Sequence, residues 1–185
     1  MWGNGLMIAP VLTEDTLQVN AYLPHGLWYD FHSFTKIISQ GKWIVLDAPL
    51  DTIPLLLRGG IIIPTQAPDI TTTKTRPKPF DLLVMFNETK QAYGDLYWDD
   101  GDTIDAYEQS LFSYYIFKAS MGRFSSTCAH WSNKAPNAIV SDVSIIGLDL
   151  PVLSVTVNGK AFTGFAYYSD KKMLHIFGLQ LPLDD

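Results

Sequence analysis

Cysteine is almost absent from this chain: Cys128 is the only one in 185 residues, so no intrachain disulfide can form. Long apolar runs are missing too, because Arg58, Gly59 and Gly60 interrupt the most hydrophobic stretch well short of the ~20 residues that a membrane-spanning helix requires. Basic residues are few, with 13 Lys and Arg against 19 Asp and Glu and a formal net charge of -6. This balance argues against nucleic acid and anionic membrane surfaces as partners.

Targeting and helical patterns are missing as well. Residues 1–12 contain neither a basic leader nor a small-residue cleavage site, so no signal peptide is predicted in this chain. No window keeps apolar residues at the spacing of a helix face for long enough to predict a convincing helix. With 47% hydrophobic and 17% charged residues, the composition is that of a packed globular protein.

What is present is alternation of apolar and polar residues, which is typical of half-buried strands. The sequence therefore predicts an all-β fold with little helix. The predicted strands cover residues 6–12, 17–23, 27–31, 42–48, 53–58, 61–64, 80–86, 94–98, 111–119, 124–130, 138–146, 152–157, 162–168 and 173–177. Such a number of short strands favours antiparallel β-sandwiches.

Residues 67–79 interrupt this alternation. Pro68, Pro77 and Pro79 lie there among several threonines, and proline cannot donate to a central strand ladder. We therefore expect a domain junction in this segment.

Asn158-Gly159 predicts a β-hairpin. The pair lies between two apolar-alternating runs and suits a type I′ turn, in which both central residues take a positive φ.

The one cluster of carboxylates is the acidic segment Asp99, Asp100, Asp102, Asp105 and Glu108. Two carboxylates can cleave a glycosidic bond, and Asp100 and Asp102, on the same side of an extended chain, are the pair that could converge. Carboxylate oxygens also bind calcium, although the full calcium-loop spacing is missing. The third interpretation is structural, with aspartates forming side-chain turns and Asp100-Gly101 reversing the chain.

Other catalytic patterns are missing. There is no Gly-x-Ser-x-Gly elbow, no His-Glu-x-x-His and no Cys-x-x-Cys, and Cys128 has no base partner apparent in the sequence. The four histidines are scattered, at positions 25, 32, 130 and 175. We therefore predict no catalytic residue, no metal ligand and no cofactor.

Aromatic side chains are frequent and admit two interpretations. They fill the cores of β-sandwiches, and they can also stack on the apolar faces of sugar rings if several are exposed on one surface. The candidates are Trp2, Trp28, Tyr29, Trp43, Trp98, Trp131, Tyr167 and Tyr168.

Two further positions carry specific expectations. Arg58 lies between apolar flanks, where an arginine usually pairs with a carboxylate, and Asp47 or Asp51 could supply one. Asn87-Glu88-Thr89 is the one N-glycosylation sequon, so Asn87 is the candidate glycosylation site.

Several segments together resemble the C-terminal part of family 31 glycoside hydrolases. The resemblance is strongest to the α-glucosidase branch that contains lysosomal α-glucosidase and the intestinal maltase and sucrase enzymes, and it fades after about residue 120. The segments are Trp2-Gly3-Asn4-Gly5, Ile8-Ala9-Pro10-Val11, Asn20-Ala21-Tyr22-Leu23-Pro24, Trp28-Tyr29-Asp30, Ala48-Pro49-Leu50-Asp51-Thr52-Ile53, residues 57–64 with Arg58-Gly59-Gly60, residues 71–76, and residues 97–108, which begin Tyr97-Trp98-Asp99-Asp100-Gly101-Asp102.

The resemblance implies two antiparallel β-sandwich domains, a small proximal one over residues 1–66 and a larger distal one over residues 67–185. The family's catalytic carboxylates lie on a (β/α)8 barrel that precedes this region, so none of them can be placed here. The chain is thus expected to be a fragment of an α-glucosidase, inactive alone, with the barrel of the parent enzyme as its partner and residues 6–8 contributing to the contact. Animal members are typically glycoproteins of the secretory pathway, lysosomal or extracellular.

Two other functions stay open from the residues. The chain could be a free-standing carbohydrate-binding β-sandwich module, with an oligosaccharide as its partner, or a hydrolase that uses Asp100 and Asp102.

Overall fold

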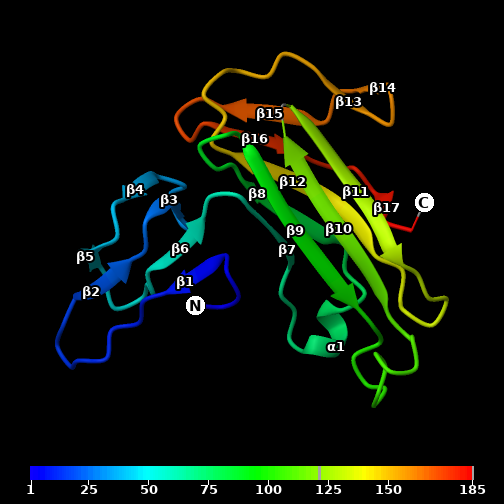
Figure 1. Ribbon diagram of the computed structural model, residues 1–185, viewed down its shortest axis with the longest axis horizontal. Coiled ribbons are helices and arrows are strands. Elements are labelled where there is room, and N and C mark those ends of the chain that lie inside the picture. Colours follow the sequence, from blue (N-terminus) through cyan, green and yellow to red (C-terminus); the bar gives the residue numbers. More distant parts are fainter. Residues whose placement is uncertain (121, 185) are drawn as a thin grey trace.

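The computed structural model describes residues 1–120 and 122–184, and strands dominate it (Figure 1). Strands account for 49% of the chain and helix for 2%. The prediction of an all-β fold with little helix is therefore confirmed.

Residues 1–58 form two packed layers. One is a four-stranded antiparallel sheet with the order β1-β6-β3-β4, and the other pairs β2 with β5. Leu23, Trp28 and Leu56 are at most 1% exposed between the layers. The strands are β1 (Leu6–Ile8), β2 (Gln18–Leu23), β3 (Gly26–Asp30), β4 (Lys36–Ser39), β5 (Lys42–Asp47) and β6 (Leu55–Arg58).

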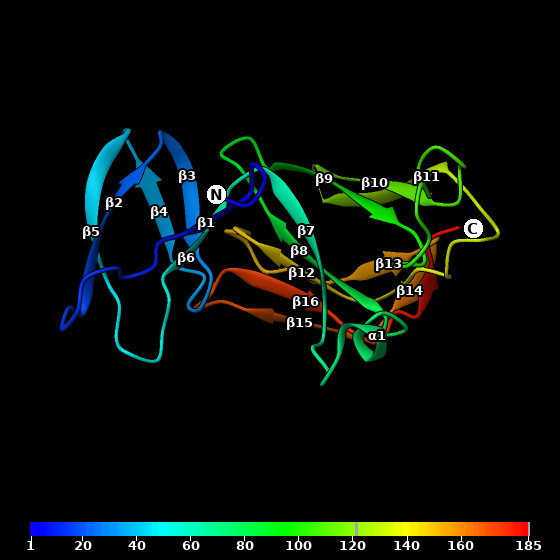
Figure 2. The same cartoon turned by 90° about the horizontal axis from the view of Figure 1, so that it is seen from below.

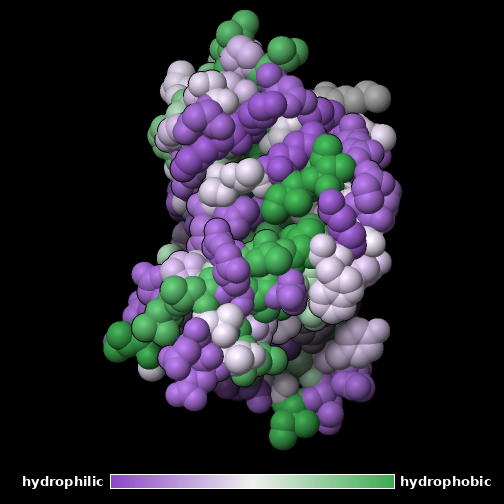
Figure 3. Space-filling view, turned by 90° about the vertical axis from the view of Figure 1, so that its left-hand side faces the viewer, coloured by the Kyte–Doolittle hydropathy of each residue, from purple (hydrophilic) through white to green (hydrophobic). Residues whose placement is uncertain are grey.

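The outer face of β2 and β5 differs from the inner one. Alternation along both strands directs Tyr22, Trp43 and Val45 outward, and all three are exposed. Figure 3 views the molecule from this end, where hydrophobic side chains in the middle are surrounded by hydrophilic ones.

The rest of the chain forms a larger sheet of nine strands with the path β11-β10-β9-β7-β8-β12-β16-β15, and β17 also pairs with β12. β13 and β14 form a separate hairpin. These strands are β7 (Ile61–Gln66), β8 (Phe80–Met85), β9 (Gln91–Trp98), β10 (Ser113–Ser120), β11 (Arg123–His130), β12 (Ile139–Ile146), β13 (Val155–Val157), β14 (Lys160–Phe162), β15 (Phe165–Tyr168), β16 (Met173–Ile176) and β17 (Leu181–Pro182).

The nine-stranded sheet folds over on itself. In Figure 2, β9, β10 and β11 lie on one side, and β12, β15 and β16 lie on the other. Phe80, Leu82 and Val84 of β8, together with Tyr115 and Phe117 of β10, are among the side chains that fill the core between them. Two parallel pairings, β7 with β9 and β8 with β12, interrupt an otherwise antiparallel arrangement.

The segment expected to be a junction connects two neighbouring strands of this sheet. β7 pairs with β8 from Ile61 opposite Met85 to Gln66 opposite Phe80, so residues on both sides of position 66 share one sheet. The segment also contains a single helical turn, α1 (Thr72–Thr75), which the sequence did not predict. It forms because the Thr71 side chain accepts a hydrogen bond from the Lys74 amide and caps the turn.

The predicted hairpin is present. Asn158 and Gly159 have φ angles of 49° and 78° and connect β13 to β14, with Val157 opposite Lys160. The predicted strand over residues 162–168 is divided, because the chain turns at Thr163 and Gly164. A side chain at Gly164 would place its Cβ 2.6 Å from the Phe177 carbonyl oxygen.

A third core cluster joins the two parts of the molecule. Leu27 and Leu57 come from the first part, Met85 and Ile146 from the second, and Tyr29 lies between them. The Tyr29 hydroxyl donates a hydrogen bond of 2.7 Å to the Phe86 carbonyl. We call this contact the seam.

Candidate functional site

The acidic segment follows the end of β9 and folds as a turn. One oxygen of Asp100 accepts hydrogen bonds from the backbone amides of Asp102 and Thr103, and the other accepts one from the Thr103 hydroxyl at 2.5 Å. Gly101 has a φ of 79°, which glycine adopts without strain. The turn that the sequence predicts at Asp100-Gly101 is therefore present.

These hydrogen bonds also decide the charge of Asp100. They lower the pKa of its carboxyl group to about 2, with the Thr103 hydroxyl making the largest contribution. A group with so low a pKa holds no proton to donate at neutral pH, and its oxygens are occupied by the turn. Asp100 is therefore unsuited to the role of the acid in a glycosidase pair with Asp102.

Asp99 is anchored to the segment before β8. Its carboxylate pairs with the Arg76 guanidinium at 3.3 Å, and Arg76 also donates to the Asp99 carbonyl. The same guanidinium lies over the Trp98 ring, 4.2 Å from its centre. Across the described ranges 1–120 and 122–184, no three His, Cys, Asp or Glu side chains converge in a way that could hold a metal ion.

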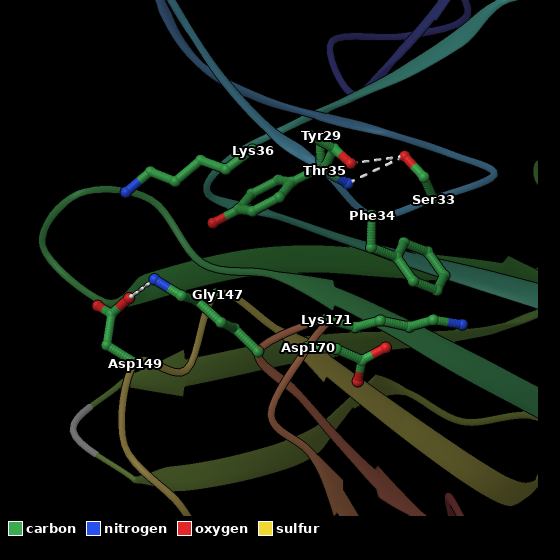
Figure 4. Close-up of a pocket in the computed structure, with 10 residues that line it drawn as sticks. Tyr29, Ser33, Phe34, Thr35, Lys36, Gly147, Asp149, Asp170 and Lys171 are labelled. Carbon is green, nitrogen blue, oxygen red and sulfur yellow. Dashed lines mark hydrogen bonds and ion pairs between the residues drawn. The ribbon is translucent and has the colours of Figure 1, made fainter.

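A cavity of about 190 Å³ lies at the seam (Figure 4). Asp149 at its edge pairs with Lys90 at 2.5 Å and with Lys172 at 3.2 Å, and these contacts lower the pKa of its carboxyl group. Burial and the nearby Asp149 raise the pKa of Tyr29 to about 12. The lining residues are Tyr29, Ser33, Phe34, Thr35, Lys36, Gly147, Asp149, Asp170, Lys171 and Lys172.

Two of the groups that line this cavity, Tyr29 and Asp149, already have partners. The Tyr29 proton is committed to a carbonyl, and the Asp149 charge is balanced by two lysines. The arrangement suits a contact between two parts of a protein better than acid–base chemistry.

The outer surface of β9, β10 and β11 carries a group of aromatic rings, here called the aromatic face: Tyr97, Tyr107, Phe112, Tyr114 and His130. Tyr97 lies opposite Tyr114, which lies opposite His130, so three rings form a row across the sheet. The Phe112 ring stacks on those of Tyr97, Tyr107 and His130, with centres 4.8, 5.3 and 4.3 Å apart.

Sequence reasoning missed this group. Its list of aromatic candidates contained Trp28, Tyr29 and Trp98, which the structure buries, and Trp2, Trp43 and Trp131, which are exposed. The signal that could have found the aromatic face is the alternation along β9, which places Tyr93, Asp95 and Tyr97 on the outer side.

The expected partner of Arg58 was wrong. Within the part of the chain that the structure describes, Arg58 forms no ion pair, and its guanidinium lies 5.7 Å from the centre of the Trp28 ring. Asp47 instead accepts a hydrogen bond from the Gln18 side chain. Stacking on an aromatic ring is the other contact that guanidinium groups favour.

The histidines and Cys128 occupy separate places. His175 contacts Ser144 and pairs with Asp142 at 3.3 Å, and His32 lies 3.2 Å from the Ile53 carbonyl. His130 has a buried Nε2 without a hydrogen-bond partner among the described residues. Burial raises the pKa of the Cys128 thiol, which keeps it protonated and poorly reactive.

Asn87 lies in the turn between β8 and β9. Its Oδ1 accepts hydrogen bonds from the Thr89 amide and hydroxyl and from the Gln91 amide. The two other residues of the sequon are exposed. Among the residues that the structure describes, no helix is long and apolar enough to cross a membrane.

Comparison with known proteins relates this fold to an enzyme family. Residues 1–63 match the family model described as the glycosyl hydrolase family 31 C-terminal domain. The chain is 34% identical over 194 residues to lysosomal alpha-glucosidase of Rattus norvegicus, a match that covers 95% of this chain and 20% of that protein. It is 36% identical over 189 residues to intestinal sucrase-isomaltase of Homo sapiens, covering 99% of this chain and 10% of that protein.

The chain belongs to glycoside hydrolase family 31. It corresponds to a C-terminal region and spans a fifth or less of these two curated relatives. The resemblance to the C-terminal part of this family, seen in the sequence, is therefore confirmed.

Solved structures show the same fold. The family 31 chain superposes on the glucosidase II alpha subunit with a TM-score of 0.80 at 23% identity, covering 97% of this chain and 22% of that one. A dextranase of the same family from Flavobacterium johnsoniae, complexed with glucose, gives a TM-score of 0.78 at 22% identity over 97% of this chain and 24% of the other.

Proposed function

We propose that this chain is a non-catalytic β region that packs on and stabilises the catalytic (β/α)8 barrel of a family 31 α-glucosidase. The whole enzyme would hydrolyse terminal α-linked glucose from maltooligosaccharides, starch or glycogen. The observation that carries the proposal is the match of nearly the whole chain to only a fifth or less of its α-glucosidase relatives. The occupied carboxylates of the acidic segment agree with a role outside catalysis.

The contact with the barrel cannot include all of the residues expected from the sequence. Of residues 6–8, Met7 points into the core of residues 1–58, and Leu6 packs into the seam, because neighbouring strand residues face opposite sides. The outer face of β2 and β5 is the better candidate. Trp43 is 69% exposed and Val45 60%, and the Tyr22 ring lies edge-on to Trp43 at 5.9 Å.

Covering this face would stabilise a complex. Apolar surface removed from water contributes about 25 cal/mol per Å². A tryptophan and a valine that a partner buries would therefore contribute about 2 to 5 kcal/mol before ordering costs. Exposed apolar patches of this kind also promote self-association when the partner is missing.

The sequence predicts a proximal unit over residues 1–66 and a distal unit over residues 67–185. We propose an earlier boundary between them. β7 pairs with β8 of the larger sheet. We therefore place the boundary between the two units at Gly59 and Gly60.

The barrel contact can be tested on the isolated chain. We expect Trp43→Ser combined with Val45→Ser to reduce self-association in sedimentation velocity and to lower the fluorescence of a hydrophobic dye. The control is Leu153→Ser combined with Ile70→Ser, two exposed apolar residues on other parts of the surface. A chain that is monomeric and binds no dye before any substitution would contradict the proposal, as would turnover of a chromogenic α-glucoside that Asp100→Asn abolishes.

Asn87 is the proposed glycosylation site, and with it we propose a location in the secretory pathway. Two relatives are named as lysosomal and intestinal enzymes, and the exposed turn offers room for a glycan. Expression through the secretory route of an animal cell should give a chain whose mass falls after glycosidase treatment. Asn87→Gln should remove this change and Thr89→Ser should keep it; an unmodified wild-type chain would refute the assignment.

A further inference from the structure

The aromatic face is unused by the function proposed above. Tyr107 is 68% exposed and Tyr97 is 40% exposed. Tyr93, on the same side of β9 and 47% exposed, extends the row of outward tyrosines. Four residues along a strand span about 13 Å, so the face is long enough for several linked sugar rings.

The polar groups of this surface are acceptors and hydroxyls. Asp95 lies between Tyr93 and Tyr97 on the exposed side of β9. Desolvation, and then the nearby Asp99, Glu108 and Asp100, raise the pKa of the Tyr97 phenol. Lys118 of β10 lies opposite Tyr93, and it is the one cation among the β10 residues that pair with β9.

We propose that the aromatic face binds a neutral oligosaccharide, whose pyranose rings stack on Tyr97 and Tyr107 while Asp95 and the tyrosine hydroxyls bond to sugar hydroxyls. The rings supply flat apolar surfaces with polar edges, which match the apolar faces and peripheral hydroxyls of a pyranose.

Other ring-shaped or apolar partners fit less well. Nucleic acid bases also stack on aromatic side chains, but their phosphates require cationic grooves, and this surface is predominantly acidic. A protein partner would favour an interface centre depleted of charge, whereas Asp95 lies within this group of rings. An uncharged polyhydroxylated ligand has no phosphates to neutralise, and its hydroxyl groups can bond to Asp95, so neither argument excludes it.

The rings are also ordered before any ligand arrives. Phe112 stacks with three neighbours at interplanar angles of 18° to 27°, so its ring supports both Tyr97 and Tyr107. Side chains that are already fixed lose little conformational entropy on binding, which favours affinity.

This site is separate from the proposed barrel contact. Figure 1 shows β2 and β5 at one end of the molecule and β9, β10 and β11 towards the other. Failure of either proposal therefore leaves the other intact.

The test is calorimetric titration of the full chain with maltoheptaose, followed by the same titration of single variants. We expect saturable binding by the wild type, about 5- to 10-fold weaker binding by Tyr107→Ala and by Tyr97→Ala, and a change of less than about 3-fold for Tyr107→Phe, which keeps the ring. The matched control is Tyr168→Ala, an exposed tyrosine on β15 that lies outside the aromatic face and should bind like the wild type.

Three results would overturn the proposal. They are no binding by the folded wild type at concentrations up to about 10 mM, equal weakening by Tyr168→Ala, and a loss in Tyr107→Phe as large as in Tyr107→Ala. Circular dichroism melts of each variant show that the fold is retained, and Tyr107, in an exposed loop, can be replaced without disturbing the core.

Discussion

Tyr29 links the two parts of the molecule through one hydroxyl group. The ring is 2% exposed, and removing its hydroxyl would leave the Phe86 carbonyl without that donor. We expect Tyr29→Phe to lower the free energy of unfolding by about 1 to 3 kcal/mol at pH 7, measured by urea denaturation. Tyr167→Phe, which removes a less buried hydroxyl from the Leu148 carbonyl, is the matched comparison and should cost less.

The same residue predicts a response to alkaline pH. The pKa of Tyr29 rises to about 12 in the folded chain, mainly through burial, so folding favours its protonated form. Its stabilising contribution is complete below the ordinary phenol pKa of about 10 and is lost as pH rises towards 12. The stability difference between wild type and Tyr29→Phe should therefore shrink over this window. A difference that stays constant to pH 12 would contradict the assignment.

Asp81 predicts a similar response at acidic pH. Burial, and then the nearby Asp142, raise the pKa of its carboxyl group, so the folded state disfavours the ionised form. Stability from this group is present below the ordinary carboxyl pKa of about 4 and is lost as pH rises through the higher folded value. Asp81→Asn should therefore stabilise the chain at pH 7, by at most about 1 kcal/mol after solvent screening, and leave it unchanged at pH 3. Asp170→Asn is the exposed control in a pH series of thermal melts.

At the scale of elements, the close approach of the neighbouring strands β7 and β9 depends on Gly94. A Cβ at this position would lie 2.2 Å from the Ile62 carbonyl oxygen, which neither backbone can accommodate without moving. We expect Gly94→Ala to cost about 2 to 4 kcal/mol in a denaturant titration. Ser120→Ala, at an exposed position of neighbouring β10, should change stability by less than about 0.5 kcal/mol. A Gly94→Ala variant with unchanged stability would show that β7 and β9 lie farther apart than described.

Local elements were easier to predict than their pairings. Asn158-Gly159 suffices to predict a hairpin because the turn and both strands are contiguous. The parallel pairing of β8 with β12 joins residues far apart in sequence, and alternation alone does not say which strands are neighbours. For the same reason, no local pattern brings Tyr107, Phe112 and His130 together.

The acidic segment shows the other limit. The turn at Asp100 followed from aspartate and glycine chemistry. The contact of Arg76 with Asp99 and Trp98 could not be predicted from the sequence, because it depends on how the α1 segment lies against the end of β9. An ion pair was predicted for Arg58 because its neighbours in sequence are apolar. Its guanidinium instead lies over the ring of Trp28.

At the scale of the whole molecule, the seam predicts that the two parts unfold together as one cooperative unit. Leu57 is 1% exposed and packs with residues of both parts, so Leu57→Ala should destabilise both by about 2 to 5 kcal/mol. Trp28 reports on the first part and Trp98 on the second. With each in turn as the sole tryptophan, the Leu57→Ala substitution should shift the denaturation curve of both backgrounds to a similar extent. A shift in only one background would mean that the two units unfold independently.

The seam also constrains how the chain can fold during synthesis. Its cluster takes Leu27 and Leu57 from the early part of the chain and Ile146 from the late part. Until the residues near Ile146 have left the ribosome, Leu27 and Leu57 lack part of the core against which they pack and stay exposed. A nascent chain stalled before that point should therefore be a better chaperone client and a better protease substrate than one stalled just after it.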